Sequence, residues 1–415
     1  DYWDAENVNY DTVKWTYNDG SDPDGLFKAF EEGTLSAARV YPNSPGYKDV
    51  LAAHPDGVTW SLPGGSTFNV TFNFNRGTYG ATSKATDAEK ADTQAAIRNR
   101  DFRLAILFGF DTRSYRAQNV GEEGADNSLR NTLVPTQFVT IEGKPFGDSV
   151  QTNLQALDTE AFGDVVLAEG QDGYFNPEKA KQYIEKARTT LEADGVTFPI
   201  HLDIPVNAKA EVSVNQVKSL KSTIESSLGT DNVVVDIQML SEDQYLQATY
   251  QATTGAAGDF DISNASGWGP DYVDPSSYLN IYDSRTGDML KTLGLEGSAL
   301  VEGEDPSKEA KEAIGLTEYD ALLDKANAIF ENTDERYAAY AEAEAWLLNN
   351  VIQIPVNSDE GLPRVTKVVP FTAPDGWAGI AANKLKYVEL QDDIVTVDQF
   401  DEAHEKWLAD REAAK

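Results

Sequence analysis

The hydrophobic pattern of the first part of the chain predicts short strands and helices. Apolar residues that alternate with polar ones predict strands over residues 13–17, 58–62 and 68–74. Apolar residues at helical spacing predict helices over residues 26–33, 86–98 and 103–110. The second helix begins with the capping-box sequence Thr86-Asp87-Ala88-Glu89. Residues 131–175 show no clear period, so we expect long loops there.

The next segment alternates regularly between helix and strand patterns. Apolar stripes predict helices over residues 176–195, 214–228 and 241–253. Between and after them, apolar-rich runs predict strands over residues 200–204, 233–240 and 259–263. His201 and Asp203 alternate with the apolar residues of the first of these strands, so we expect that strand to be half-buried. This order of elements implies a largely parallel sheet covered by helices.

The last part of the chain returns to strand patterns after two helices. The pattern predicts helices over residues 316–332 and 334–350, then strands over residues 351–356, 365–369 and 385–390. An α/β unit with β-rich segments on both sides predicts two lobes joined by two chain crossings. We place a β-rich first lobe at residues 1–75 and 356–415 and an α/β second lobe at residues 76–355. Ligands of such proteins bind in the cleft between the lobes.

The composition narrows the classes of partner. The 415 residues include 69 acidic and 34 basic side chains, for a net charge of −35, which excludes nucleic acid as a natural partner and disfavours an anionic membrane surface. The chain contains no Cys, which removes disulfides, thiolate metal sites and Cys nucleophiles and suits an exported bacterial protein. The longest apolar stretch, residues 104–110, is far shorter than the roughly 20 residues that span a bilayer. The acidic start does not resemble a signal peptide, so we expect a mature form or a fragment.

Motifs for catalysis or cofactor binding are missing from the sequence. His54, His201 and His404 are scattered and have no partner at metal-ligand or triad spacing. Phosphate-binding, dinucleotide-binding and nucleophile-elbow motifs are absent. Residues 20–31 partly imitate a calcium loop, but Gly20 stands where the first ligand belongs and Pro23 stiffens the loop, so we expect a turn before a helix. We predict no metal and no cofactor.

The most unusual segment, GWGPDYVDP at residues 267–275, follows the third strand of the α/β unit. Its two glycines allow another backbone to approach closely, and Trp268 offers a broad apolar plane. Asp271 accepts hydrogen bonds when ionised and can hold an ammonium group. The alternative interpretation is a glycine-rich turn with a core Trp and with Asp274 as a helix cap. Turn chemistry alone leaves both interpretations open.

Residues 267–279, GWGPDYVDPSSYL, resemble the GWGPDY-x-DP-x-x-YLD segment of the oligopeptide-binding proteins of solute-binding protein family 5. These proteins are the extracytoplasmic receptors of ABC peptide importers. Other motifs of the family are similar to residues 103–111, 131–136 and 176–180 and to the start Tyr2-Trp3-Asp4, in the same order. Over essentially the whole chain, the motifs are similar to those of the AmiA/AliA/AliB-like lipoproteins of Gram-positive cocci.

Two departures from the family pattern bear on the fold. The Tyr-Trp pair lies well inside the family's sequences, after the lipidated Cys and much of the first lobe, so this sequence resembles the C-terminal portion of a longer receptor. Thr112 stands between Asp111 and Arg113, where the family has Asp-Arg, and we expect only a structural effect. The resemblance therefore implies an α/β, two-lobe periplasmic-binding-protein-like fold of class II with an incomplete first lobe. Because a first-lobe strand that faces the peptide is expected to be missing, we expect weakened peptide binding by this chain.

The resemblance also implies a function and a site. The chain would capture oligopeptides for an ABC transporter, with permease subunits as partners and a lipid anchor to the extracellular face of a Gram-positive membrane. Asp271 would pair with the peptide's N-terminal ammonium group, and Trp268 would wall a side-chain pocket. The peptide-binding residues we predict are Gly267, Trp268, Gly269, Asp271, Tyr272 and, from the strand at the lobe crossing, Asn73.

Two other functions remain as alternatives. The same fold could receive another ligand, such as a pheromone peptide or a metal–chelate. A protein of another class, a hydrolase, would use Asp271 and Asp274 as its pair of carboxylates. The sequence offers no third catalytic group beside that pair, so we predict binding without covalent chemistry.

Overall fold

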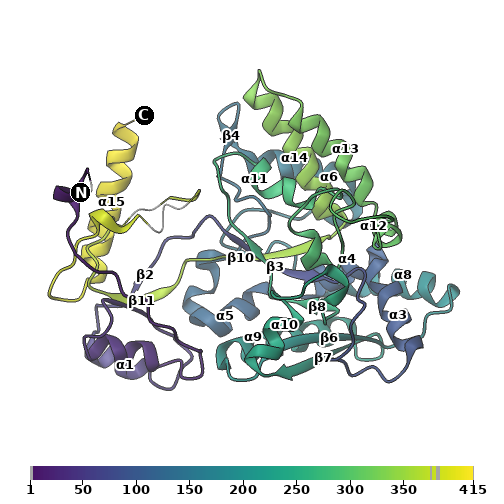
Figure 1. Ribbon diagram of the computed structural model, residues 1–415, viewed down its shortest axis with the longest axis horizontal. Coiled ribbons are helices and arrows are strands. Elements are labelled where there is room, and N and C mark those ends of the chain that lie inside the picture. The colour runs from purple at the N-terminus through teal and green to yellow at the C-terminus, as the bar shows by residue number, and fades with distance from the viewer. Residues whose placement is uncertain (1–2, 374–375, 380–383, 415) are drawn as a thin grey trace.

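The buried apolar residues form two separate clusters, and each organises one body of the computed structural model, which describes residues 3–373, 376–379 and 384–414 (Figure 1). The smaller body holds both ends of the described chain and packs around Phe30, Val40, Val50 and Val365. Its antiparallel sheet has the order β1–β11–β2. The elements of this body are α1 (Gly25–Glu31), β1 (Ala37–Arg39), α2 (Tyr47–Ala53), β2 (Thr59–Trp60), β11 (Pro363–Thr366) and α15 (Val397–Ala413).

The larger body contains two main sheets. The first has the order β10–β3–β8, with β9 also paired to β3, and all of its pairs are antiparallel. The second consists of two parallel strands. A short hairpin adds two more strands. The bounds are β3 (Thr67–Phe72), β4 (Thr140–Ile141), β5 (Lys144–Pro145), β6 (Ile200–Asn207), β7 (Val233–Leu240), β8 (Ile262–Ser263), β9 (Gly267–Trp268) and β10 (Gln353–Ser358).

Helices surround these sheets (Figure 1). The first six are α3 (Asp87–Arg98), α4 (Arg100–Gly109), α5 (Thr112–Gly124), α6 (Phe146–Leu157), α7 (Thr159–Phe162) and α8 (Pro177–Ala193). The others are α9 (Glu211–Leu228), α10 (Glu242–Ala248), α11 (Ser276–Leu279), α12 (Lys308–Ala313), α13 (Leu316–Asn327) and α14 (Thr333–Asn349). Local signals fix many of their ends: the capping box at Thr86 is present, and Asn176 caps α8 with Pro177 at its first position.

Several local predictions are wrong. Residues 13–17 form no strand, and Trp15 and Tyr17 are 78% and 75% exposed, so the alternation there reflects no buried face. The segment expected to be all loop, residues 131–175, contains α6, α7 and the β4–β5 hairpin. Residues 385–390 contain a short 3₁₀ turn and a single bridge from Leu390 to Val368 instead of a strand.

The parallel sheet is smaller than predicted. β6 and β7 pair in parallel, but β8 pairs antiparallel with β3 and meets β6 through one main-chain bond, from Asp261 N to Asp203 O at 3.0 Å. Asp203 is fully buried, so the first strand is not half-buried as expected.

The two crossings between the bodies lie near the predicted boundaries but not at them. β3 and β10 pair with each other, and their residues Val70, Phe72 and Ile354 belong to the large core. The change of body therefore occurs between β2 and β3 on the outward path and between β10 and β11 on the return. We propose that the lobes meet at these two connections, β2 to β3 and β10 to β11, rather than at residues 75 and 356.

Five buried charged residues fix the place where β6 and β8 meet. Arg76 Nη1 and Lys84 Nζ each lie 2.8 Å from Asp203 Oδ2, and Asp259 and Asp261 complete the cluster. Burial by itself raises the pKa of Asp203, but the attraction of Lys84 and several hydrogen bonds lower it overall to about 2. The ionised form of Asp203 therefore stabilises the folded chain.

We expect Asp203→Asn to lower the free energy of unfolding at pH 7 by about 3–5 kcal/mol, because it leaves buried cations without a full partner. The contribution of Asp203 is present above pH 3.8, its ordinary pKa, and is lost as the pH falls toward 2. Urea unfolding at pH 7 and pH 3 measures both effects. Asp87→Asn, whose side chain is 98% exposed, is the control, and equal losses for the two variants would contradict the prediction.

Candidate ligand cleft between the two bodies

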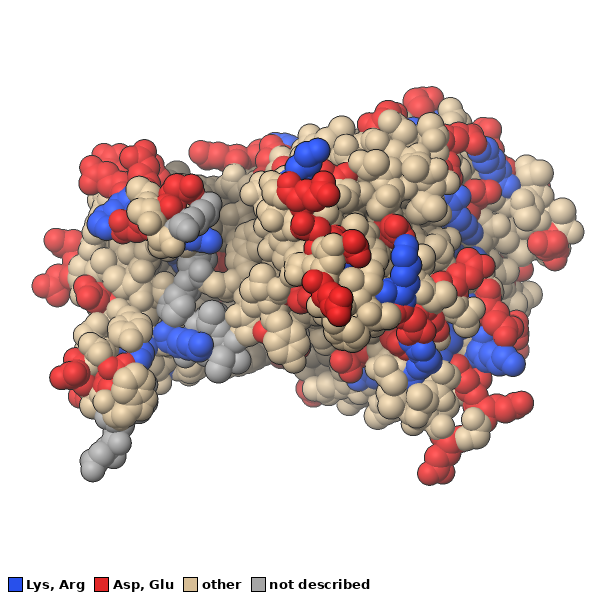
Figure 2. Space-filling view, turned by 90° about the horizontal axis from the view of Figure 1, so that it is seen from above, with Lys and Arg blue, Asp and Glu red and all other residues tan. Residues whose placement is uncertain are grey.

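A cavity of 490 Å³ lies between the two bodies. One wall is the outgoing crossing, Gly64 to Ser66, and another is the loop from Gly269 to Asp271. The third wall comes from the returning chain and includes Asp359, Arg364 and Trp377. Figure 2 shows the recess between the bodies from above, with acidic side chains on both of them. The cavity therefore contains part of the segment that the sequence singled out.

The predicted segment is held in place by strand pairing. In β9, Gly267 pairs with Phe68 and Trp268 with Thr67 of β3. A Cβ at Gly267 would lie 2.7 Å from the ring of Phe68, so this close pairing favours glycine there. Trp268 Nε1 donates to Ser277 O at 2.7 Å, and its ring packs against the large core. Trp268 is thus a partly buried residue packed on the core, directly before Gly269, which lines the cavity.

Asp271 and Tyr272 follow this strand on the surface. The main-chain N–H of Asp271 donates to Ser277 Oγ at 2.7 Å, which fixes the backbone. The Asp271 side chain is exposed and makes no hydrogen bond or ion pair with any described residue, and Tyr272 is 70% exposed. Asp271 lines the cavity, and in this conformation its carboxylate is open to water.

Asp274 has a structural role. Its Oδ1 accepts from Ser276 N at 2.9 Å, and its Oδ2 lies 3.2 Å from Arg336 Nε. Burial alone would raise the pKa of Asp274, but the hydrogen bonds from Arg336 and Ser276 lower it below its usual value. The carboxylate is therefore engaged as a cap and an ion pair, which disfavours its use with Asp271 as a catalytic pair.

Asn73 does not face the cleft. It is 0% exposed, and its Nδ2 donates to Gly258 O at 3.0 Å while its Oδ1 accepts from Asn75 N at 3.1 Å. In this conformation its side chain satisfies main-chain groups of its own turn and of Gly258, and its contact with a ligand stays a prediction.

The sequence analysis missed the residues that position the crossing. Arg130 is 1% exposed and donates to Gly64 O and Ser66 O, both at 3.0 Å. The hydroxyl of Tyr278 donates to Gly65 O between them. These donors come from segments far apart in sequence, so no local pattern could have identified them, although Tyr278 lies in the quoted motif.

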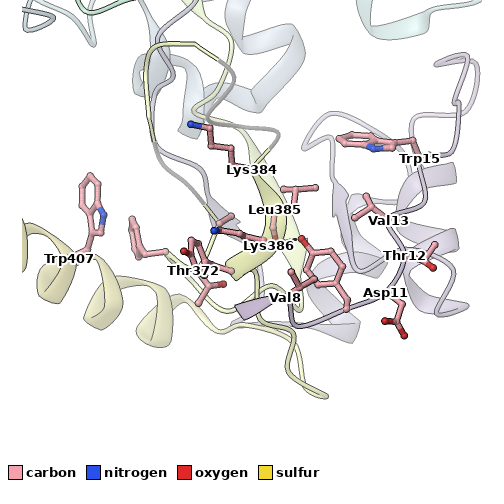
Figure 3. A pocket seen from close by; sticks show the side chains of 14 residues that line it. Val8, Asp11, Thr12, Val13, Trp15, Thr372, Lys384, Leu385, Lys386 and Trp407 are labelled. Carbon is pink, nitrogen blue, oxygen red and sulfur yellow. Dashed lines mark hydrogen bonds between the residues drawn. The ribbon is translucent and has the colours of Figure 1, made fainter. Parts of the chain in front are cut away.

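A larger cavity, of 1290 Å³, lies within the smaller body (Figure 3). Val13 and Trp15 face it from the N-terminal segment, and Leu385 and Trp407 from the C-terminal part. It contains none of the predicted site residues. We therefore take the smaller interlobe cavity as the candidate site.

The described residues give two further negative findings. Within the described ranges, no group of three or more His, Cys, Asp or Glu side chains is arranged to hold a metal ion. In the same ranges, none of the helices has the length and hydrophobicity that a membrane crossing requires.

Sequence comparisons identify relatives of known type. The sequence model of the family described as "Bacterial extracellular solute-binding proteins, family 5 Middle" matches residues 1–289. Oligopeptide-binding protein AliB of Streptococcus pneumoniae is 43% identical over 412 residues, covering 99% of this chain and 62% of that protein. Oligopeptide-binding protein SarA of Streptococcus gordonii is 42% identical over 414 residues, covering 99% of this chain and 61% of that protein. The chain thus spans somewhat less than two thirds of the length of these relatives.

Comparison with solved structures confirms the two-lobe fold. Listeria monocytogenes OppA bound to peptide matches with a TM-score of 0.59 and 17% identity, over 94% of this chain and 60% of that one. The substrate-binding domain of an oligopeptide ABC transporter from Bacillus anthracis matches with a TM-score of 0.57 and 19% identity. The match covers 94% of this chain and 61% of that one. At such low identity the likeness establishes the fold alone.

A buried acid supports the loop behind the cleft. Glu344 of α14 is 0% exposed, and its Oε1 accepts from Leu133 N at 2.6 Å and from Val134 N at 3.0 Å. Burial raises the pKa of Glu344 to about 8, against the opposing effect of these two hydrogen bonds.

We expect the stability of the wild-type chain to fall between about pH 4.5 and pH 8, because Glu344 stays protonated in the folded chain while it ionises in the unfolded chain. This group alone contributes a slope of as much as about 1.4 kcal/mol per pH unit. Glu344→Gln keeps an acceptor oxygen and removes that slope. Urea unfolding at pH 5, 6, 7 and 8 measures it, with Glu342→Gln, a half-buried residue of the same helix, as control. Parallel curves for wild type and Glu344→Gln would refute the assignment.

Proposed function

Because the chain belongs to the bacterial extracellular solute-binding proteins of family 5, we propose that it captures oligopeptides for an ABC transporter. It would act at the extracellular face of a Gram-positive cell membrane, held there by a lipid anchor. The transporter's permease subunits would receive the peptide from it. The chain would bind its ligand and carry out no reaction on it.

The observation that carries this proposal is the identity of 40–43% with oligopeptide-binding proteins over 99% of the chain. The structure supports a role for the segment that carries the resemblance, because Gly269 and Asp271 line the interlobe cavity. An extended peptide would pair with the main chain of Gly267 and Gly269, as in recognition by strand addition. Trp268 and Tyr272 would contact its side chains.

Asp271 would bind the N-terminal ammonium group of the peptide. Its carboxylate is exposed at the cavity and has no cation beside it among the described residues, so it is available to a guest. Asp359 and Glu360 line the same cavity, and together with Asp271 they outweigh the charge of Arg364, so the lining favours a cationic group. Burial of this pair under a bound peptide would strengthen it, because the local dielectric constant falls.

We expect Asp271→Asn to weaken the binding of free peptides about tenfold or more, since it removes one partner of a charge-assisted hydrogen bond. Acetylation of the peptide's N-terminus should weaken binding to the wild-type chain by a similar factor and have little further effect on the variant. Calorimetry with a pool of random nonapeptides, free and acetylated, measures all four combinations.

Asp288→Asn is the control, because it removes one charge from an exposed residue of the larger body. This variant should bind both pools as the wild type does. Equal binding of free and acetylated pools by the wild-type chain would exclude the proposed role of Asp271. Binding of a metal–chelate and of no peptide by the same chain would favour the other-ligand receptor.

A further inference from the structure

A short segment of the smaller body reaches into the cleft and contacts the edge that the guest peptide would use. We call residues 376–379 the strap; Gly376, Trp377 and Gly379 all line the interlobe cavity. Gly379 N donates to Pro270 O at 2.9 Å, which links the strap to the loop between Gly269 and Asp271. Gly379 has a φ of +70°, a conformation that favours glycine.

The bond to Pro270 is significant because a proline has no main-chain N–H. Its carbonyl is therefore the one main-chain hydrogen-bonding group that Pro270 can offer to an extended guest. In the structure that carbonyl already accepts from Gly379 N. A guest amide placed at this point of the edge would make the same kind of bond that the strap now makes.

The other side of the strap lies against the outgoing crossing. A Cβ at Gly65 would lie 2.4 Å from Trp377 O and 3.0 Å from Trp377 Cα. The main chain of the strap thus passes directly over the main chain of Gly65, where a larger residue would collide with backbone atoms. The strap occupies space between the two walls of the cleft.

The side chain of Trp377 anchors the strap to the larger body. Its ring lies parallel to the ring of Phe138, with an interplanar angle of 7° and 6.5 Å between ring centroids. Trp377 also lines a second cavity, of 540 Å³, which contains Phe138 and Val273. An offset aromatic pair of this kind stabilises a contact modestly, so the strap can be displaced.

We propose that residues 376–379 act as an internal competitor that occupies the end of the peptide-pairing edge at Pro270 and is displaced by a bound peptide; this inference rests on the function proposed above. The strap makes a main-chain bond to the edge from within the same chain, as a guest would from outside. The measured affinity is then the intrinsic affinity multiplied by the fraction of molecules in which the strap is displaced.

Substitutions in the strap test the competition directly. Trp377→Ala removes the ring contact with Phe138, and Gly379→Ala strains the conformation from which the bond to Pro270 is made. Both should increase the affinity for the nonapeptide pool about threefold or more, because they raise the fraction with the strap displaced. Phe330→Ala, which removes an aromatic ring that is 86% exposed, should leave the affinity unchanged.

Amide exchange of Gly379 gives a second readout that does not depend on the variants. The N–H of Gly379 should exchange slowly in the free chain and faster at saturating peptide, because its bond to Pro270 is broken. Unchanged or slower exchange on peptide addition would overturn the competition. Equal or weaker binding by both variants, compared with a wild type that binds, would also overturn it. In either case Trp377 would be a permanent wall of the site. Absence of binding by the wild type and both variants would overturn the proposed function and the strap's role with it.

Discussion

The arrangement of the cleft depends on how one buried guanidinium group holds the main chain. Where the chain leaves the smaller body, the carbonyl groups of Gly64 and Ser66 are half-buried, and their hydrogen-bonding capacity is met by buried donors. Arg130 supplies them from a position that is 1% exposed, and Tyr278 serves the carbonyl between them. This crossing forms one wall of the cavity and determines where Gly65 meets Trp377. A shift of the crossing would move both the cleft and the strap.

The chemistry of the cleft fits a receptor that grips backbone and one terminal charge. Its lining combines glycines, which leave the main chain open, with the carboxylates of Asp271, Asp359 and Glu360. Affinity from main-chain pairing does not depend on the guest's side chains, so with the proposed function such a site would accept peptides of many sequences. The strap adds a constraint from within the protein, since Pro270 O already accepts a hydrogen bond from Gly379 N in this conformation.

The elements that were predicted correctly carry strong local signals. Helix α3 begins with a capping box, α8 begins with the cap Asn176 and Pro177, and α9 ends at Gly229. The helix α6 was missed, and β8 was assigned to the wrong sheet, because a strand of two residues does not specify its partner. Asp203 was expected on a half-exposed face, but three-dimensional packing surrounds it with Arg76 and Lys84.

The sequence by itself determined the family, the two-lobe fold and the segment that reaches the cleft, because a run such as GWGPDY and the caps of helices are local and keep their meaning in any context. Tertiary structure alone decided that Asn73 bonds to Gly258, that Asp274 pairs with Arg336, and that Arg130 and Trp377 come to the cleft. The physical reason is that hydrogen bonds and ion pairs between distant segments depend on where the chain returns in space. The periodicity of a single segment contains no information about that return.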